Sequence, residues 1–263
     1  MNCVPMVAEP ATMETTEDAV LGGRLRLRQP KRGHRVGHDA ILLAAATGAR
    51  TGEHAIDLGA GVGAAGLALA ARVDGLKVTL VEIDAALCGL AAGNVTLNGM
   101  GDRVRVVQGD VEDGAGLAVA GVAAGSADRI LMNPPFHGAG RHQASPDPGR
   151  RQAYIAESGL LARWTAAAAN LLRPHGVLTL IWRADGLAEV REALSGGFGS
   201  LAELPVLPRD GAPAIRVLVR AVKGGRSQES AYPALVLNDA LGKPTAAAEA
   251  VLRGGEALPM ASV

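Results

Sequence analysis

Aromatic residues are scarce in this sequence, with two each of tryptophan, tyrosine and phenylalanine among 263 residues. Hydrophobic residues still make up 48% of the chain, so we expect a globular core built from aliphatic side chains. Cysteine is equally rare. Cys3 and Cys88 form no metal-ligand spacing and indicate a reducing, cytoplasmic compartment. Because the histidines also lack ligand spacing, no metal site is expected.

Neither sign of charge is in excess, because 26 Lys and Arg residues balance 26 Asp and Glu residues. The whole molecule is therefore not a polycation, and any contact with nucleic acid must come from local basic patches. No apolar run is long enough for a membrane span, and the N-terminus lacks the basic-then-apolar order of a signal peptide. We accordingly expect no membrane partner.

The length of the chain suits one large domain with flanking segments. Residues 1–17 are polar and acidic without periodicity, which predicts a disordered leader. Residues 18–223 form the predicted domain, and its N-terminal part, residues 18–50, is expected on the substrate side. Residues 224–263 are predicted to be a C-terminal tail that contains a helix at 245–253.

The first part of the domain has the pattern of a nucleotide-binding βαβ unit. A short apolar strand at 54–58 is followed by a glycine loop at 59–63 and a small-residue helix at 64–72. Glycines let a ligand approach the backbone, and a helix N-terminus favours a negative group. The second strand, 78–81, ends at Glu82. The carboxylate of this residue is placed to accept hydrogen bonds from both hydroxyls of a ribose.

Two more polar positions follow predicted strands. The strand at 103–107 leads to Asp110, whose carboxylate suits an adenine amino group. The strand at 127–132 ends at the motif Asn133-Pro134-Pro135-Phe136, because prolines cannot donate to a sheet. The residue before a proline is held extended, which places the Asn133 side chain at the carboxyl end of the strand. The Asn133 oxygen, the Pro134 carbonyl and the Phe136 ring suit a planar group that bears an NH2.

The glycine loop alone is open to another interpretation. Residues 61–66 match the dinucleotide fingerprint GxGxxG, a weak signal in a chain rich in glycine and alanine. A NAD-dependent dehydrogenase also needs an acid after the second strand, and Glu82 supplies one. Such an enzyme does not explain Asp57 before the loop, Asp110 after the third strand or the motif at 133–136.

Taken together, these features resemble the class I S-adenosylmethionine-dependent methyltransferases that modify amino groups. Residues 57–63 look like their donor loop, Glu82 looks like their ribose acid, and Asp110 looks like their adenine contact. The implied catalytic residues are Asn133, Pro134, Pro135 and Phe136. The implied binding residues for S-adenosyl-L-methionine are Asp57, Gly59, Gly61, Gly63, Glu82, Ile83, Asp110, Val111 and Asn133.

The resemblance extends to one group of these enzymes. Residues 29–43 look like the N-terminal signature of the bacterial tRNA(Val) adenine-N6 methyltransferase family, and residues 148–153 look like its lid pattern. The likeness covers about residues 20–225. It implies an α/β, Rossmann-like fold, with a seven-stranded, mostly parallel sheet, an antiparallel last strand and helices on both faces. The implied reaction is N6-methylation of an adenine in RNA, with tRNA as the expected partner.

Other functions stay open at this point. Related enzymes with the same catalytic motif methylate a glutamine amide in a protein such as a release factor, or an amino group of a ribosomal RNA base. An inactive methyltransferase-like fold that serves as an RNA-binding or scaffold module is a third alternative. The intact set of motifs argues against the inactive module.

A basic segment favours an RNA substrate. From Arg24 to Arg35 the chain has six Lys or Arg residues and no acid, which indicates either a solvated strand face or a stripe that contacts phosphates. The long polar loop at 137–151 is a candidate substrate lid. The predicted RNA-contacting residues are Arg28, Lys31, Arg32, Arg35, His38, Arg141, Arg150 and Arg151.

Overall fold

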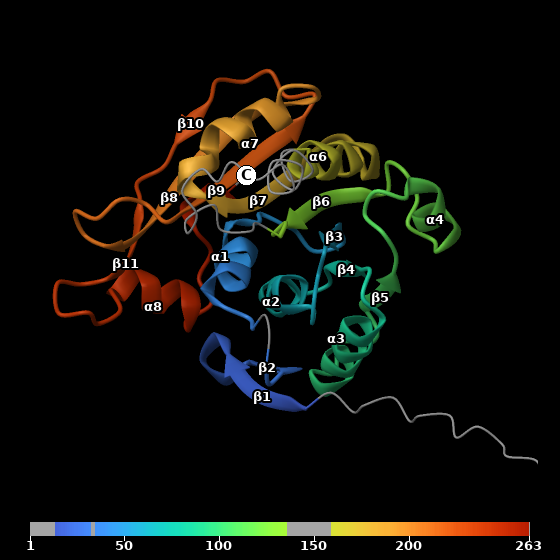
Figure 1. Ribbon diagram of the computed structural model, residues 1–263, viewed down its shortest axis with the longest axis horizontal. Coiled ribbons are helices and arrows are strands. Elements are labelled where there is room, and N and C mark those ends of the chain that lie inside the picture. Colours follow the sequence, from blue (N-terminus) through green and yellow to red (C-terminus); the bar gives the residue numbers. More distant parts are fainter. Residues whose placement is uncertain (1–13, 33–34, 136–158, 263) are drawn as a thin grey trace, which may run out of the picture.

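The structure, a computed structural model, describes residues 14–32, 35–135 and 159–262 (Figure 1). Most of the predicted leader lies outside these ranges. So do four predicted site residues, Phe136, Arg141, Arg150 and Arg151. No helix in the described ranges has the length and hydropathy needed to cross a membrane.

A single sheet runs through the molecule in the strand order β10-β8-β9-β7-β6-β3-β4-β5. The strands from β5 to β7 in this order are mutually parallel, and β9 runs antiparallel to both β7 and β8. The seven main strands are β3 (His54–Leu58), β4 (Lys77–Glu82), β5 (Val104–Gln108), β6 (Ala127–Met132), β7 (Leu172–Arg183), β8 (Phe198–Arg209) and β9 (Arg216–Lys223). The predicted mostly parallel sheet with an antiparallel last strand is confirmed, and two short strands from the C-terminal segment extend it from the predicted seven strands to nine.

Helices cover both faces of this sheet, as expected (Figure 1). One face carries α1 (His38–Ala46), α2 (Ala64–Arg72) and α3 (Ala85–Leu97). The other face carries α4 (Gly114–Val119), α6 (Leu160–Leu171) and α7 (Leu187–Leu194). Each face has its own cluster of buried side chains, which are almost all aliphatic. The scarcity of aromatic residues is thus met by two aliphatic cores, one on each side of the sheet.

The predicted leader ends earlier than expected. Strand β1 (Thr15–Val20) pairs with β2 (Leu25–Pro30) as an antiparallel hairpin, so residues 15–17 are part of a strand. Glu17 of β1 lies opposite the basic Arg28 of β2 across the hairpin. Backbone pairing with β2, whose Leu25 and Leu27 are buried in the core, accounts for the order of this acidic segment.

The predicted tail packs onto the domain. It adds β10 (Ser230–Ala231) and β11 (Leu235–Asn238) beside β8, followed by α8 (Ala246–Leu252) in the predicted helical region. Met260 is fully buried, and the amide of Leu258 donates to the carbonyl of Ala45 in α1 at 2.8 Å. Apolar residues in this segment complete the core beneath α1, so residues 224–262 belong to the same folded unit.

Two asparagines, one in α3 and one at its C-terminal cap, hold the hairpin against the domain. The side chain of Asn94 accepts from the amide of Arg28 at 2.7 Å and donates to its carbonyl at 2.9 Å. Asn98, one helical turn later, makes the same pair of bonds with the backbone of Arg26. Asn94 is fully buried and also donates to the carbonyl of Val62 in the glycine loop at 3.0 Å. This one side chain therefore connects the hairpin, α3 and the loop.

We expect Asn94→Ala to lower the free energy of unfolding by about 3 kcal/mol, because it leaves partly buried backbone groups of Arg28 and the buried carbonyl of Val62 without partners. Asn98→Ala is the matched control, with the same bonding pattern at a more exposed position, and should cost about 1 kcal/mol. Urea denaturation of the three proteins measures both values. Equal costs for the two substitutions would contradict the bridging role of Asn94.

Candidate active site

The predicted site residues follow strands whose carboxyl ends meet at one edge of the sheet. In the register of the sheet, Leu58 of β3 lies beside Val81 of β4 and Met132 of β6. Glu82 lies beside Gln108 of β5. Strand β4, which follows β3 in the chain, pairs with one side of β3, and the later strand β6 pairs with the other side. The strand order therefore reverses at β3. Open α/β sheets bind ligands at this position.

The glycine loop between β3 and α2 needs glycine for its backbone conformation. Gly59, Gly61 and Gly63 have φ values of 69°, 57° and 86°, in the left-handed region. A Cβ at Gly61 would have no neighbour within 4 Å, so this side of the loop is open. The Gly61 amide donates to Oε2 of Glu82 at 2.8 Å, which fixes the loop beside the end of β4. A ligand can therefore approach the backbone here.

Glu82 holds the loop with one oxygen and the start of α3 with the other. Its Oε1 accepts from the amide of Asp84 at 2.9 Å, and Asp84 in turn caps α3 by accepting from Ala86 and Leu87. The Glu82 side chain is largely buried. Each carboxylate oxygen has a second lone pair, so both remain able to accept a hydrogen bond from a diol.

Asp57 turns away from this open side. Its Oδ2 accepts from the amide of Gly66 in α2 at 2.8 Å, and the residue is 2% exposed. Burial raises the pKa of Asp57 to about 7, the hydrogen bond from Gly66 opposes this rise, and the charge of Glu82 adds to it. The structure thus gives Asp57 a role in fixing the start of α2 and no exposed surface for the predicted ligand contact.

Residues after β4 and β5 form the next part of the edge. Ile83 is 63% exposed, which is unusual for a large aliphatic side chain and leaves an apolar surface beside the loop. The amide of Gly109 donates to the carbonyl of Glu82, and this bond brings the exposed Asp110 to the same region. Val111 is buried in the core, so only its backbone is available to a ligand. An apolar surface next to an exposed carboxylate suits a purine with an amino group.

Asn133 is the most informative residue of the edge. Its Oδ1 atom is buried and has no hydrogen-bond partner among the described residues. Buried acceptors in folded proteins are nearly always paired, because leaving one unpaired costs about 1–3 kcal/mol. Pro134 is buried and Pro135 is exposed, so the turn is fixed on its inner side. The unpaired oxygen is consistent with a site that receives an N–H donor from a ligand.

One residue that packs against the site has no sequence motif. Trp164 of α6 packs against the backbone of Gly59, where an added Cβ would lie 2.5 Å from the indole ring. Glycine at position 59 is therefore required by both its φ value and this contact. The sequence signals only that tryptophan is rare here, and nothing in the motif pattern connects helix α6 with the loop.

The basic segment is less free than the sequence indicated. Glu17 forms ion pairs with Arg26 and Arg28, and the hydrogen bond from Arg28 lowers the pKa of Glu17. Two more pairs join Lys31 to Glu14 at 3.2 Å and Arg35 to Asp18 at 2.8 Å. These acids precede the basic segment in the chain, and only the hairpin brings them opposite it.

Of the described residues predicted to contact RNA, two form no ion pair in the described part of the chain. Arg32 lies after β2 and His38 opens α1, and both are exposed. Among the described residues, no three His, Cys, Asp or Glu side chains gather in a way that would hold a metal ion.

The raised pKa of Asp57 predicts a pH-dependent effect of Asp57→Asn. Folded Asp57 holds its proton up to about pH 7, whereas the unfolded residue loses it near its ordinary pKa of 3.8. Because the unfolded state binds fewer protons than the folded state in this range, the free energy of unfolding of the wild type falls as pH rises from about 4 to 7. The unfolding free energy of the variant relative to wild type should rise over that window by about 3 kcal/mol and then level off.

Urea denaturation at pH values from 4 to 8 would measure this difference, with Asp74→Asn at an exposed position as the control for loss of one charge. A difference between Asp57→Asn and wild type that stays constant across the range would contradict a buried, proton-holding Asp57.

Comparison with known proteins shows what this chain is similar to. The family model of the methyltransferase small domain matches residues 35–205. A tRNA1(Val) (adenine(37)-N6)-methyltransferase from Porphyromonas gingivalis is 33% identical over 161 residues, which are 60% of this chain and 62% of that protein. A release factor glutamine methyltransferase from Chlorobaculum tepidum is 30% identical over 152 residues, 56% of this chain and 51% of that protein. The chain thus spans less than two thirds of the length of these relatives.

A solved structure agrees with these matches. The crystal structure of a predicted O-methyltransferase, Atu636 from Agrobacterium tumefaciens, superposes with a TM-score of 0.70 and 28% identity. The superposition covers 84% of this chain and 98% of that one. The family match extends over more than half of the chain and includes both the glycine loop and Asn133. The chain therefore belongs to the methyltransferase small domain family, within the class I S-adenosylmethionine-dependent methyltransferases.

Proposed function

We propose that this protein transfers a methyl group from S-adenosylmethionine to the N6 nitrogen of an adenine in RNA, with tRNA as the substrate class. The observation that carries the proposal is the Oδ1 of Asn133 at the carboxyl end of β6, beside the glycine loop, which is buried and has no hydrogen-bond partner among the described residues. Pro134 restricts the backbone of Asn133 to an extended conformation, which places this acceptor before a substrate arrives. A preorganised acceptor of this kind is what an amino-group substrate requires.

The residues present fit the cofactor. Gly61 offers an open backbone surface, Glu82 retains lone pairs for the ribose hydroxyls, and Ile83 with Asp110 suits the adenine ring and its amino group. When bound, S-adenosylmethionine supplies a methyl group activated by its positively charged sulfur. Asp57 is assigned a positioning role at the start of α2 because its carboxylate is buried and bonded to Gly66.

The target nitrogen is a poor nucleophile, because its lone pair is delocalised into the adenine ring. The Asn133 side-chain oxygen and the Pro134 carbonyl would accept hydrogen bonds from the two N–H groups of this nitrogen. That arrangement favours a pyramidal nitrogen whose lone pair is directed out of the ring plane. The proton is acidic once the nitrogen carries the methyl group, so no strong base is required. Most of the rate enhancement would come from positioning and fixed dipoles.

Two observations favour RNA as the substrate. One relative is a tRNA1(Val) (adenine(37)-N6)-methyltransferase, and residues 29–43 resemble the N-terminal signature of that group. Exposed Arg32 and His38 are the described residues of the predicted RNA surface that have no acid partner in the described ranges, so we assign them the first phosphate contacts. Arg28, Lys31 and Arg35 would have to exchange a carboxylate partner for a phosphate.

Methylation of a glutamine amide in a protein is the second candidate. The relative from Chlorobaculum tepidum is a release factor glutamine methyltransferase, and an amide nitrogen presents the same two N–H bonds to Asn133 and Pro134. The two substrates differ in charge, because a peptide carries no phosphates. An assay that offers RNA and protein separately distinguishes the two substrates.

Transfer of labelled methyl groups from S-adenosylmethionine should be measured on total bacterial RNA and, separately, on a protein extract. We expect label in small RNA that digests to N6-methyladenosine. Label in protein alone would replace the proposal with glutamine methylation, and label in neither fraction would contradict both.

Asn133→Ala should lower kcat by about 100- to 1,000-fold, since it removes a preorganised acceptor for the reacting amino group. Affinity for S-adenosylmethionine, measured by calorimetry, should change little because the glycine loop and Glu82 are intact. Asn170→Ala, at an exposed position in α6, is the matched control and should keep wild-type turnover. Wild-type turnover by the Asn133 variant would overturn the mechanism.

A further inference from the structure

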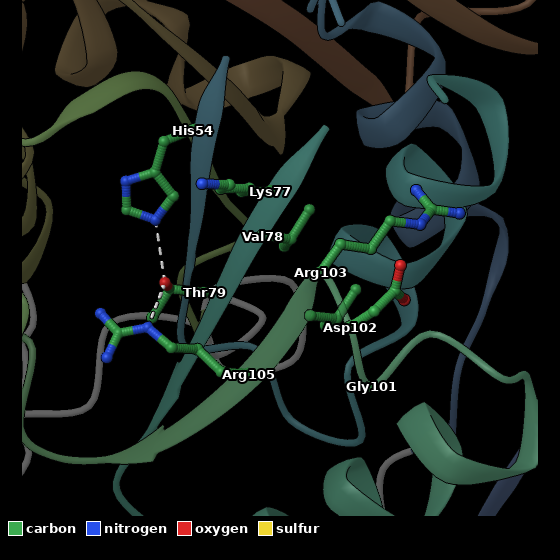
Figure 2. Close-up of a pocket in the computed structure, with 9 residues that line it drawn as sticks. His54, Lys77, Val78, Thr79, Gly101, Asp102, Arg103 and Arg105 are labelled. Carbon is green, nitrogen blue, oxygen red and sulfur yellow. Dashed lines mark hydrogen bonds between the residues drawn. The ribbon is translucent and has the colours of Figure 1, made fainter. Parts of the chain in front are cut away.

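A cavity of about 480 Å³ lies at the opposite end of the central strands from the candidate active site (Figure 2). It is lined by residues at the amino ends of β3, β4 and β5, including His54, Lys77 and Arg105. None of the predicted site residues lines it. The parallel strands thus carry the candidate active site at their carboxyl ends and a separate basic groove at their amino ends.

The face of β4 and β5 that carries Lys77 and Arg105 changes from apolar to polar along the strands. Alternate residues of a strand share a face, so Lys77 and Thr79 lie on the same side as Val81, and Arg105 lies on the same side as Val107. Val81 and Val107 are buried in the cluster to which α4 contributes. Lys77 and Arg105 are exposed at the other end of the strands. Helix α4 has six residues, and the polar ends of β4 and β5 extend past the core that it covers.

A hydrogen-bonded chain fixes Arg105 in the groove (Figure 2). Its Nε donates to the hydroxyl of Thr79 at 3.1 Å, and another guanidinium nitrogen donates to the carbonyl of Gly121 at 2.8 Å. The Thr79 hydroxyl lies 2.9 Å from Nε2 of His54, and Nδ1 of His54 lies 3.1 Å from the carbonyl of Ser126. Because a carbonyl oxygen can only accept, Nδ1 of His54 donates the hydrogen bond to Ser126. An already ordered guanidinium loses little entropy when it binds an anion.

The two exposed cations of the groove have no carboxylate partner in the described part of the chain. The nearby acid Asp128 is already engaged, because it pairs with Arg173 at 2.6 Å and accepts from the backbone amide of His54. Lys77 and Arg105 point to the same side in Figure 2. Their positive charges are therefore not neutralised by ion pairs within the described residues.

Two other charged residues line the cavity without changing this result. Arg103 points away from Lys77 and Arg105 in Figure 2, and its guanidinium donates to the carbonyls of Ala70 and Val73 at the end of α2. Asp102 lies next to Arg103. The groove contrasts with the β1–β2 hairpin, where acids of β1 and the residue before it pair with several of the cations.

We propose that this basic groove, formed around Lys77 and Arg105, binds backbone phosphates of the RNA substrate at a distance from the methylated base. The inference rests on the proposed function, since it assigns a second contact to the same substrate. Strand β4 runs from Lys77 to Glu82, and six residues of strand span roughly 17 Å. A macromolecular polyanion reaches from one end of β4 to the other, whereas a single nucleotide does not.

The test uses the full-length protein and compares Lys77→Gln, Lys77→Arg and wild type in binding to unmodified bacterial tRNA at several KCl concentrations. Lys243→Gln is the matched control. It removes the same charge from an exposed turn after β11, at the opposite edge of the sheet from β5. Affinity for S-adenosylmethionine and methylation kinetics are measured on the same proteins.

Lys77→Gln should weaken RNA binding about 3- to 10-fold and reduce the slope of log K against log[salt] by roughly 0.7 to 1, as for the loss of one phosphate contact. Its KM for RNA should rise while kcat and cofactor affinity stay at wild-type values. Lys77→Arg should retain binding because the charge is kept, and Lys243→Gln should bind like wild type.

Unchanged RNA affinity in Lys77→Gln, with a wild-type enzyme that methylates RNA, would overturn the groove and leave the proposed function intact. Equal losses in Lys77→Gln and Lys243→Gln would also overturn it, because the effect would then reflect net charge alone. A wild-type protein that neither binds nor methylates RNA would overturn the proposed function and the groove together.

Discussion

The parallel register of β3 with β4 and β6 is the constraint on which the site depends. Parallel pairing aligns the carboxyl ends of neighbouring strands, so the glycine loop, Glu82 and Asn133 leave the sheet at one edge although they are far apart in sequence. The hydrogen bond from the Gly61 amide to Glu82 then fixes the loop against the end of β4. With another register, the glycine loop, Glu82 and Asn133 would not lie at the same edge of the sheet.

The residues around this edge separate into two groups. Glu82, Ile83, Asp110 and Asn133 present a surface or a lone pair to a ligand. A second group acts behind them: Asp57 fixes the start of α2, Trp164 packs on Gly59, and Asn94 connects the loop to α3 and the hairpin. Buried polar side chains whose bonds are all satisfied are rigid, and such rigidity holds ligand-binding groups at the positions that catalysis needs.

Charge is arranged differently on the two basic surfaces. Most cations of the basic segment form ion pairs with acids of β1 and the residue before it, and exposed pairs of this kind contribute little to stability and are screened by salt. The groove at the amino ends of β4 and β5 keeps Lys77 and Arg105 without such partners in the described ranges. A chain with no net charge can therefore still present a local positive field to a polyanion.

The sequence by itself determined the order of strands β3 to β6, the glycine loop, Glu82 and the turn at Asn133, because these depend on local periodicity, backbone preference and motif spacing. Tertiary structure decided the rest. The pairing of Glu17 with Arg28, the burial of Asp57, the packing of Trp164 on Gly59 and the groove at Lys77 all join residues that are distant in the chain. Contacts of this kind depend on strand register and on which face of the sheet each helix covers. The local sequence around either residue of a contact does not specify these features.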